Sequence, residues 1–192
     1  MRLVARQRRI RALWDALQDP DRKSWIAVKD ISVEKLFETI GVEKTGEFSE
    51  CPEEELCYFD RKNGWHLIIA NHDCLMESKV AWLTELSSGR EVLSLFVEEH
   101  VMYSAACCWR NGKREWLVEH DCERGLEDIK TEGVLPQCFQ EVHEQLLTEL
   151  RNDKNPCDYL FDVPVEIGRR LTGFGHDRTM DDLDEEVYWE LV

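Results

Sequence analysis

The adjacent residues Asn111-Gly112, set between two strand-like segments, constrain the fold more than any other feature of the sequence. Asn-Gly favours a two-residue type I′ turn, because both residues tolerate the positive φ angles that this turn requires. Residues 95–109 before the pair and residues 115–120 after it contain many aromatic and β-branched side chains, which are common in strands. The sequence therefore predicts a β-hairpin closed at Asn111-Gly112.

Pairing outward from this turn with a constant index sum places Arg110 opposite Lys113 and divides the hairpin into two faces. We expect one face to be apolar and to form part of the core. Its pairs are Trp109 with Arg114, Cys107 with Trp116, Ala105 with Val118, and Tyr103 with His120. We expect the other face to be an acidic surface. Its pairs are Cys108 with Glu115, Ala106 with Leu117, Ser104 with Glu119, Met102 with Asp121, and His100 with Glu123.

A second Asn-Gly pair, Asn63-Gly64, lies between Tyr58-Phe59-Asp60-Arg61-Lys62 and Trp65-His66-Leu67-Ile68-Ile69. These flanking segments also resemble strands, so the same type I′ turn is expected here. The two hairpins follow each other without the alternation of strand and helix that a parallel sheet requires. This order favours antiparallel pairing.

Several other segments have apolar residues at helical spacing. Ser32 is suited to cap a helix that ends at Gly41, and Pro136 is suited to a first helical turn. The expected helices span residues 10–17, 33–40, 73–89, 135–150 and a segment from the cap candidate Asp162 to residues 173–175. Together these elements predict an α+β fold, with a mostly antiparallel sheet of hairpins and meanders and with helices packed on one face.

The 192 residues carry a formal net charge of −16, and this charge is unevenly distributed. Residues 1–23 hold seven basic and three acidic residues, a balance of +4, which leaves −20 for residues 24–192. We therefore expect a basic N-terminal segment, helical or mobile, followed by one α+β domain with an acidic C-terminal tail. Acids concentrate in residues 47–60 and 177–192. The ordinary alternative for such runs is a solvated surface that keeps the protein soluble.

Composition also excludes several classes of protein. A phosphate-backbone binder needs clustered lysine and arginine, so nucleic acid is not an expected partner. No secretory signal or membrane-spanning segment is apparent, which predicts a cytoplasmic protein that does not bind a membrane. In a reducing cytoplasm we expect the eight cysteines to be reduced packing residues.

Residues Glu98-Glu99-His100 and His120-Asp121-Cys122, with His176-Asp177, are the candidates for metal binding or acid–base catalysis. Their spacing matches no metal motif, since the sequence has neither CxxC nor HExxH. Neighbouring residues of a strand point to opposite faces, so these dipeptides cannot chelate as units. We therefore expect no metal, no cofactor and no catalytic residue.

The strand at residues 97–104, the Trp109-x-Asn111-Gly112 turn, the segment Trp116-x-Val118-x-His120-Asp121 and residues 161–177 resemble a group of uncharacterised bacterial proteins. That group is associated with immunity proteins of interbacterial toxin systems, of the polymorphic or type VI kind. The resemblance covers residues 30–178. It implies a small acidic protein of the bacterial cytoplasm that binds and blocks a toxin.

Charge and resemblance together favour a non-catalytic binding protein that neutralises a cognate toxin by blocking its basic active site. A hydrolase or metal-dependent enzyme using Glu98, His100 and Asp121, and an adaptor or secretion chaperone, are the alternatives. The sequence assigns neither the target nor the oligomeric state. The predicted binding residues are Glu98, His100, Ser104, Glu115, Glu119, Asp121, Asp181, Asp182 and Trp189.

Overall fold

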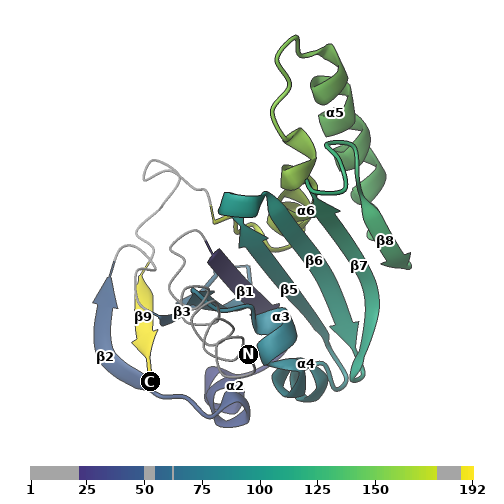
Figure 1. Ribbon diagram of the computed structural model, residues 1–192. Helices are drawn as coiled ribbons and strands as arrows, with labels where there is room; N and C mark the ends of the chain where they lie inside the picture. The colour runs from purple at the N-terminus through teal and green to yellow at the C-terminus, as the bar shows by residue number, and fades with distance from the viewer. Residues whose placement is uncertain (1–21, 50–54, 62, 177–186) are drawn as a thin grey trace, which may run out of the picture.

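The computed structural model describes residues 22–49, 55–61, 63–176 and 187–192, and its main feature is one antiparallel sheet (Figure 1). The nine strands formed by these residues lie in the order β2-β9-β3-β4-β1-β5-β6-β7-β8. The α+β class with an antiparallel sheet is confirmed. The strands are β1 (Arg22–Val28), β2 (Lys44–Ser49), β3 (Leu56–Asp60), β4 (His66–Asn71), β5 (Glu91–Glu98), β6 (Tyr103–Arg110), β7 (Lys113–Asp121), β8 (Lys130–Gly133) and β9 (Tyr188–Leu191).

Helices lie against both faces of this sheet. One face is covered, as predicted, by α5 (Phe139–Asn152), α6 (Asp162–Thr172) and the short 3₁₀ helix η2 (Tyr159–Phe161). Side chains from all three helices belong to one core. On the opposite face, α2 (Val33–Ile40), α3 (Leu75–Ser78) and α4 (Val80–Leu86) contribute to a second core. Figure 1 shows these three helices at one end of the sheet and α5 projecting beyond the other.

Strand β1 separates the two cores. Trp25 and Ala27 belong to the core beneath α5 and α6, whereas Ile26 and Val28 belong to the core beneath α2 and α4. All four side chains have no exposed surface, as expected for a strand covered on both faces. The sheet is therefore buried on both sides at its centre and can present an open face only towards its edges.

Several predicted helix boundaries are confirmed and others move. Ser32 caps α2 by accepting a hydrogen bond from the Lys35 backbone N–H at 3.2 Å, and Gly41 ends the helix at φ 74°. The expected helix at residues 73–89 is two short helices, α3 and α4. Asp162 is the first residue of α6 rather than its cap, and α5 begins at Phe139, after the turn that contains Pro136.

The Asn111-Gly112 turn is a type I′ turn, with φ angles of 51° and 74°. However, a bulge between Cys108 and Trp109 changes the predicted register. Trp109 pairs with Arg114 as expected, but Cys108 then pairs with Trp116. From that point β6 is shifted by one residue. The prediction was therefore wrong for the faces of β6, and right for the side of β7 that carries the acids.

The Asn63-Gly64 loop is not the predicted two-residue turn. Asp60 pairs with His66, so five residues connect β3 to β4, and Asn63 is not among the residues with positive φ. The Asn63 amide donates to the Thr172 carbonyl at 2.8 Å, at the end of α6. The side chain is therefore used to hold the loop against a helix, which widens the turn.

The predicted helix at residues 10–17 lies outside the described residues. Among the described helices, none has the length and apolar character needed to cross a membrane.

Candidate functional site

The ends of β5, β6 and β7 enclose a surface hollow of about 470 Å³. It lies on the sheet face opposite α5 and α6, beyond the region covered by α3 and α4. Phe96, Ala105 and Leu117 supply apolar walls, and Tyr103 adds an aromatic ring. We call this side of β6 and β7 the open face, and the side packed against η2 and α6 the closed face.

Four carboxylates line the hollow, and two arginines accompany them. Glu98 comes from β5, Glu119 and Asp121 from β7, and Glu123 from the turn after β7. Arg22 and Arg114 lie on the same lining. The Arg22 guanidinium binds Glu98 at 2.9 Å. The hollow therefore combines apolar walls with a rim of mixed charge that is acidic in balance.

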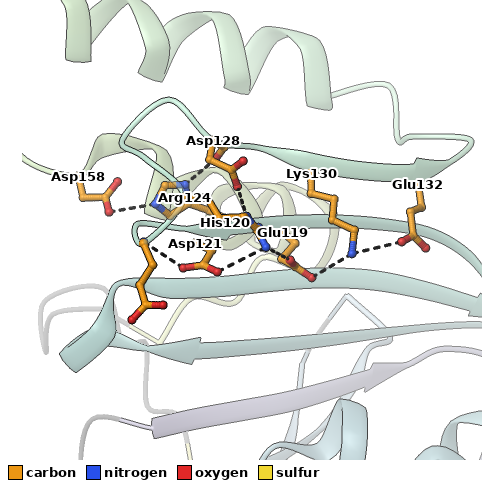
Figure 2. A network of polar contacts seen from close by, with 9 residues as sticks. Glu119, His120, Asp121, Arg124, Asp128, Lys130, Glu132 and Asp158 are labelled. Atoms are coloured by element: carbon orange, nitrogen blue, oxygen red, sulfur yellow. Dashed lines mark hydrogen bonds and ion pairs between the residues drawn. The ribbon is translucent and has the colours of Figure 1, made fainter.

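A single arginine from the β7–β8 connection organises the acidic rim (Figure 2). The Arg124 guanidinium lies 2.9 Å from Glu119, 3.4 Å from Asp121 and 2.8 Å from Asp128. The Asp128 hydrogen bond is the main reason that the pKa of Arg124 is raised. Arg124 therefore holds the Glu119 and Asp121 carboxylates beside each other.

The charged rim continues along β8. Lys130 lies 3.8 Å from Glu119 and 3.4 Å from Glu132, and Arg114 binds Glu132 at 2.7 Å. The charge of Arg114 lowers the pKa of Glu132, so that carboxylate is ionised at neutral pH. Across the hollow and this extension, six carboxylates face four basic side chains, a surplus of two negative charges. The carboxylates are Glu98, Glu119, Asp121, Glu123, Asp128 and Glu132, and the basic residues are Arg22, Arg114, Arg124 and Lys130.

The closed face carries polar groups that are sealed inside the protein. Ser104 donates to the Phe161 carbonyl at 2.6 Å. The His120 Nε2 atom lies 2.9 Å from Asp158 and its Nδ1 atom lies 2.7 Å from the Asp128 carbonyl. The His120 side chain is 0% exposed and that of Asp158 is 6% exposed. These contacts fasten η2 and the β7–β8 connection to the sheet.

Three of the predicted site residues come together at the hollow: Glu98, Glu119 and Asp121. Ser104 was predicted beside them, but the bulge at Glu115 of β7 shifts the pairing by one residue, so Ser104 lies on the closed face, where it is fully buried. The site assignment of Ser104 to the acidic surface was therefore wrong. Glu115 lies near the turn, and its carboxylate binds Arg110 at 3.1 Å.

The remaining predicted residues lie elsewhere. His100 is in the 3₁₀ helix η1 (Glu99–Val101) and is exposed, but it is not among the residues that line the hollow. Its predicted pairing with Glu123 in a strand was wrong for this reason. Trp189 lies on β9, towards the other end of the sheet. Asp181 and Asp182 are outside the described residues.

The histidine and cysteine candidates are separated by the fold. His120 and Asp121 point to opposite faces of β7 as expected, and His176 contacts Glu99 rather than Asp121, at 3.1 Å. No group of three or more potential metal ligands occurs within the described ranges. Burial raises the pKa of both Cys107 and Cys108 to about 12. Both are therefore protonated thiols at neutral pH, and a neutral thiol is a poor nucleophile.

Sequence reasoning missed the arginines of this site. Arg124 follows Asp121 by three residues and precedes Asp128 by four, a spacing that allows ion pairs in a turn or helix. Arg22 is 76 residues from Glu98, and no local pattern links them. Tyr103 was missed because the pairing of β6 with β7 was misassigned, whereas Phe96 lies on β5, for which no face was predicted.

Comparison of the chain with protein-family models, with curated proteins and with solved structures finds no match. The resemblance to immunity proteins therefore stays a prediction. The functional interpretation rests on the hollow and its charged rim.

Proposed function

We propose that this protein is a non-catalytic binding protein which neutralises a basic protein, specifically a bacterial toxin, through the hollow on its open face. The observation that carries the proposal is the combination of apolar walls from Phe96 and Leu117 with preset carboxylates at Glu119 and Asp121. Such a surface suits a partner that presents apolar and cationic side chains together.

The electrostatics favour a cationic partner. The surplus of carboxylates around the hollow acts together with the net charge of −16 of the chain. A negative field accelerates the approach of a basic surface, and its effect weakens as salt is added. Binding over the active site of a toxin that acts on nucleic acid would compete with an anionic substrate. Steric occlusion of that kind requires no catalytic group in this protein.

The hydrolase alternative has less support from the geometry. Glu98 and Asp121 do line the same hollow, but Glu98 is bound to Arg22 and Asp121 to Arg124. His100 is not among the lining residues. The adaptor alternative depends on residues 1–23, most of which lie outside the described ranges.

The proposal can be tested by capture and protection in bacteria. The unmodified chain should retain a basic protein from cells that encode it, and co-expression should relieve that protein's toxicity. A variant with Glu119→Gln, Asp121→Asn and Glu123→Gln should lose both effects. A matched variant with Glu85→Gln, Glu144→Gln and Glu149→Gln removes equal charge from exposed positions on α4 and α5, and it should retain both. Equal behaviour of the two variants would refute the proposal, as would a captured protein that is harmless.

A further inference from the structure

A lysine at the opposite edge of the sheet is surrounded by aromatic rings. The Lys44 Nζ atom lies 4.2 Å from the ring centroid of Trp189, 5.0 Å from that of Tyr58 and 6.0 Å from that of Phe37. The rings come from β9, β3 and α2, which are far apart in the sequence. We call Phe37, Tyr58 and Trp189 the aromatic cage.

The rings are held by contacts of their own. Phe37 meets Tyr58 edge to face, with centroids 5.0 Å apart and an interplanar angle of 86°. Tyr58 is 2% exposed, and its hydroxyl contacts the His66 Nδ1 atom at 2.9 Å. Phe48 lies over Trp189 at 5.5 Å. The cage therefore has walls that do not depend on the lysine alone.

Lys44 binds to these walls without a carboxylate. Among the described residues, no acidic side chain lies within ion-pair distance of its ammonium group, although Asp60 is near enough to influence its titration. Lys44 as a whole is exposed, and the partial burial of its ammonium group against the rings lowers its pKa. An ammonium group over several ring faces is stabilised by the negative face of each ring. The cage therefore recognises a cation through its rings.

The strand that carries Lys44 lies at one edge of the sheet and is held at its start, where the Glu43 and Val192 backbones exchange two hydrogen bonds of 2.9 Å. Among the described strands β2 pairs with β9 alone, at one edge of the sheet, and the register breaks between Lys44 and Phe48. Gly46 has φ 95° within this irregular stretch. The irregularity begins after Lys44, whose backbone position is paired with Leu191. The exposed Lys44 side chain can therefore leave the cage by rotation alone, without disturbing the sheet.

The surroundings favour an external cation over a neutral group. In β2, β3 and β9, Lys44 is the one basic residue, and the acidic residues are Glu47, Asp60 and Glu190. Phe48 is 62% exposed and Val192 is 78% exposed at the same edge. A basic segment with apolar neighbours would find complementary charge and contact area here.

We propose that the aromatic cage is a binding site for the ammonium group of a lysine from a protein partner, and that Lys44 occupies it in the free protein. The site is separate from the hollow on the open face, because β4 and β1 lie between β3 of the cage and β5 of the hollow. It can therefore exist whether or not the proposed function is correct.

The test uses Nα-acetyl-lysine methylamide, which keeps its side-chain ammonium group, as the probe. Nα-acetyl-norleucine methylamide is its neutral counterpart. Binding is followed by NMR titration of the tryptophan indole signals in the full chain. Lys44→Ala should bind the lysine probe at least about tenfold more tightly than the unmodified chain, which corresponds to about 1.4 kcal/mol and lies within the cation–π range. The norleucine probe should not saturate either protein.

Two kinds of variant make the test specific. Adding Trp189→Leu or Phe37→Leu to Lys44→Ala should abolish the gain in affinity for the lysine probe. Two separate double variants are used because one of them could be defective in folding. Lys113→Ala, an exposed lysine beside the Asn111-Gly112 turn, should bind like the unmodified chain. Equal affinity of the Lys44→Ala and unmodified chains would overturn the proposal, as would equal binding of both probes. In either case Lys44 would be a structural contact of β2.

Discussion

The two faces of the β6–β7 hairpin use polar side chains in opposite ways. On the closed face, Ser104 and His120 have partners inside the protein and almost no contact with water. On the open face, Glu119 and Asp121 are held by Arg124 but remain at the wall of a hollow. Buried polar groups that are satisfied internally specify a fold, whereas exposed and oriented carboxylates can serve a partner. The same strands therefore carry a structural face and a candidate binding face.

The largest effect is expected for His120→Ala on the closed face. It leaves the buried Asp158 carboxylate without its hydrogen-bond partner, and an unsatisfied buried charged group costs about 3 kcal/mol or more. The free energy of unfolding, measured by urea denaturation, should fall by that amount. A loss below about 1 kcal/mol would show that the pair contributes little and that the faces do not differ as described.

A smaller loss is expected for Ser104→Ala. This substitution removes the donor to the Phe161 carbonyl on the buried side of β6, and an unsatisfied buried group costs about 1–3 kcal/mol. Ser94→Ala is the matched control, because Ser94 on β5 is equally buried but its hydroxyl has no hydrogen-bond partner among the described residues. Urea denaturation of both variants compares a hydrogen-bonded buried serine with an unbonded one. Equal losses would show that the Ser104 hydrogen bond contributes nothing to stability.

Open-face substitutions should have the smallest effect on folding. The Arg124 side chain is 39% exposed, and exposed ion pairs contribute about 0–1 kcal/mol each. Arg124→Met removes three such pairs, which share one guanidinium and do not add in full, so it should reduce the free energy of unfolding by about 2 kcal/mol or less, and added salt should narrow the difference. A loss as large as that of His120→Ala would make Arg124 a structural residue.

Thiol chemistry gives a pH-dependent comparison. The pKa of Cys107 and Cys108 is raised to about 12 from the ordinary 9.0 by burial, so the folded state keeps protons that the unfolded state releases above pH 9. The contribution of these two thiols to the free energy of unfolding should therefore be constant below pH 9 and decrease between pH 9 and 12. Cys107→Ala and Cys108→Ala should each flatten this decrease. A pH-independent stability in that range would contradict the assignment.

The rate of alkylation by iodoacetamide at pH 8, followed at each cysteine by mass spectrometry, should distinguish buried from exposed thiols. Among the seven described cysteines, the exposed Cys157 should be modified well before Cys107 or Cys108. Early modification of either buried thiol would show that the sheet opens readily.

The elements fixed by local chemistry were predictable. Asn111-Gly112 encodes its turn through two residues that accept positive φ, and Ser32 and Gly41 bound α2 through caps. Alternation along β7 also placed Glu119 and Asp121 correctly on one side. These features depend on residues close together in the sequence, and local sequence patterns therefore predict them.

The features that depend on distant segments were not predictable. The turn at Asn111 is attached to the C-terminal end of α4. The Asn111 N–H donates to the carbonyl of Ser87, the residue that follows this helix, at 2.7 Å. The bulge places the Glu115 carbonyl against Gly133, where an added Cβ would lie 1.8 Å from that oxygen. No local signal marks this packing of β8 on β7. The bulge shifts the pairing of β6 with β7 by one residue, and this shift places Ser104 on the closed face instead of the open face.

The long-range pairs of the site were hidden for the same reason. His120 meets Asp158 across 38 residues, and Arg22 meets Glu98 across 76. Charge counts indicated an acidic body but did not show that most open-face carboxylates have basic partners. The structure therefore reduces the candidate surface from long acidic runs to one hollow with a small surplus of negative charge.

We propose that the open face binds a basic protein partner. Isothermal titration calorimetry tests this directly, with the captured partner titrated against two chains that each lack three carboxylates. The open-face variant carries Glu119→Gln, Asp121→Asn and Glu123→Gln, and the control carries Glu85→Gln, Glu144→Gln and Glu149→Gln. We expect Kd to rise at least about tenfold for the open-face variant and about twofold or less for the control. Equal Kd values for the two variants would refute binding through the open face.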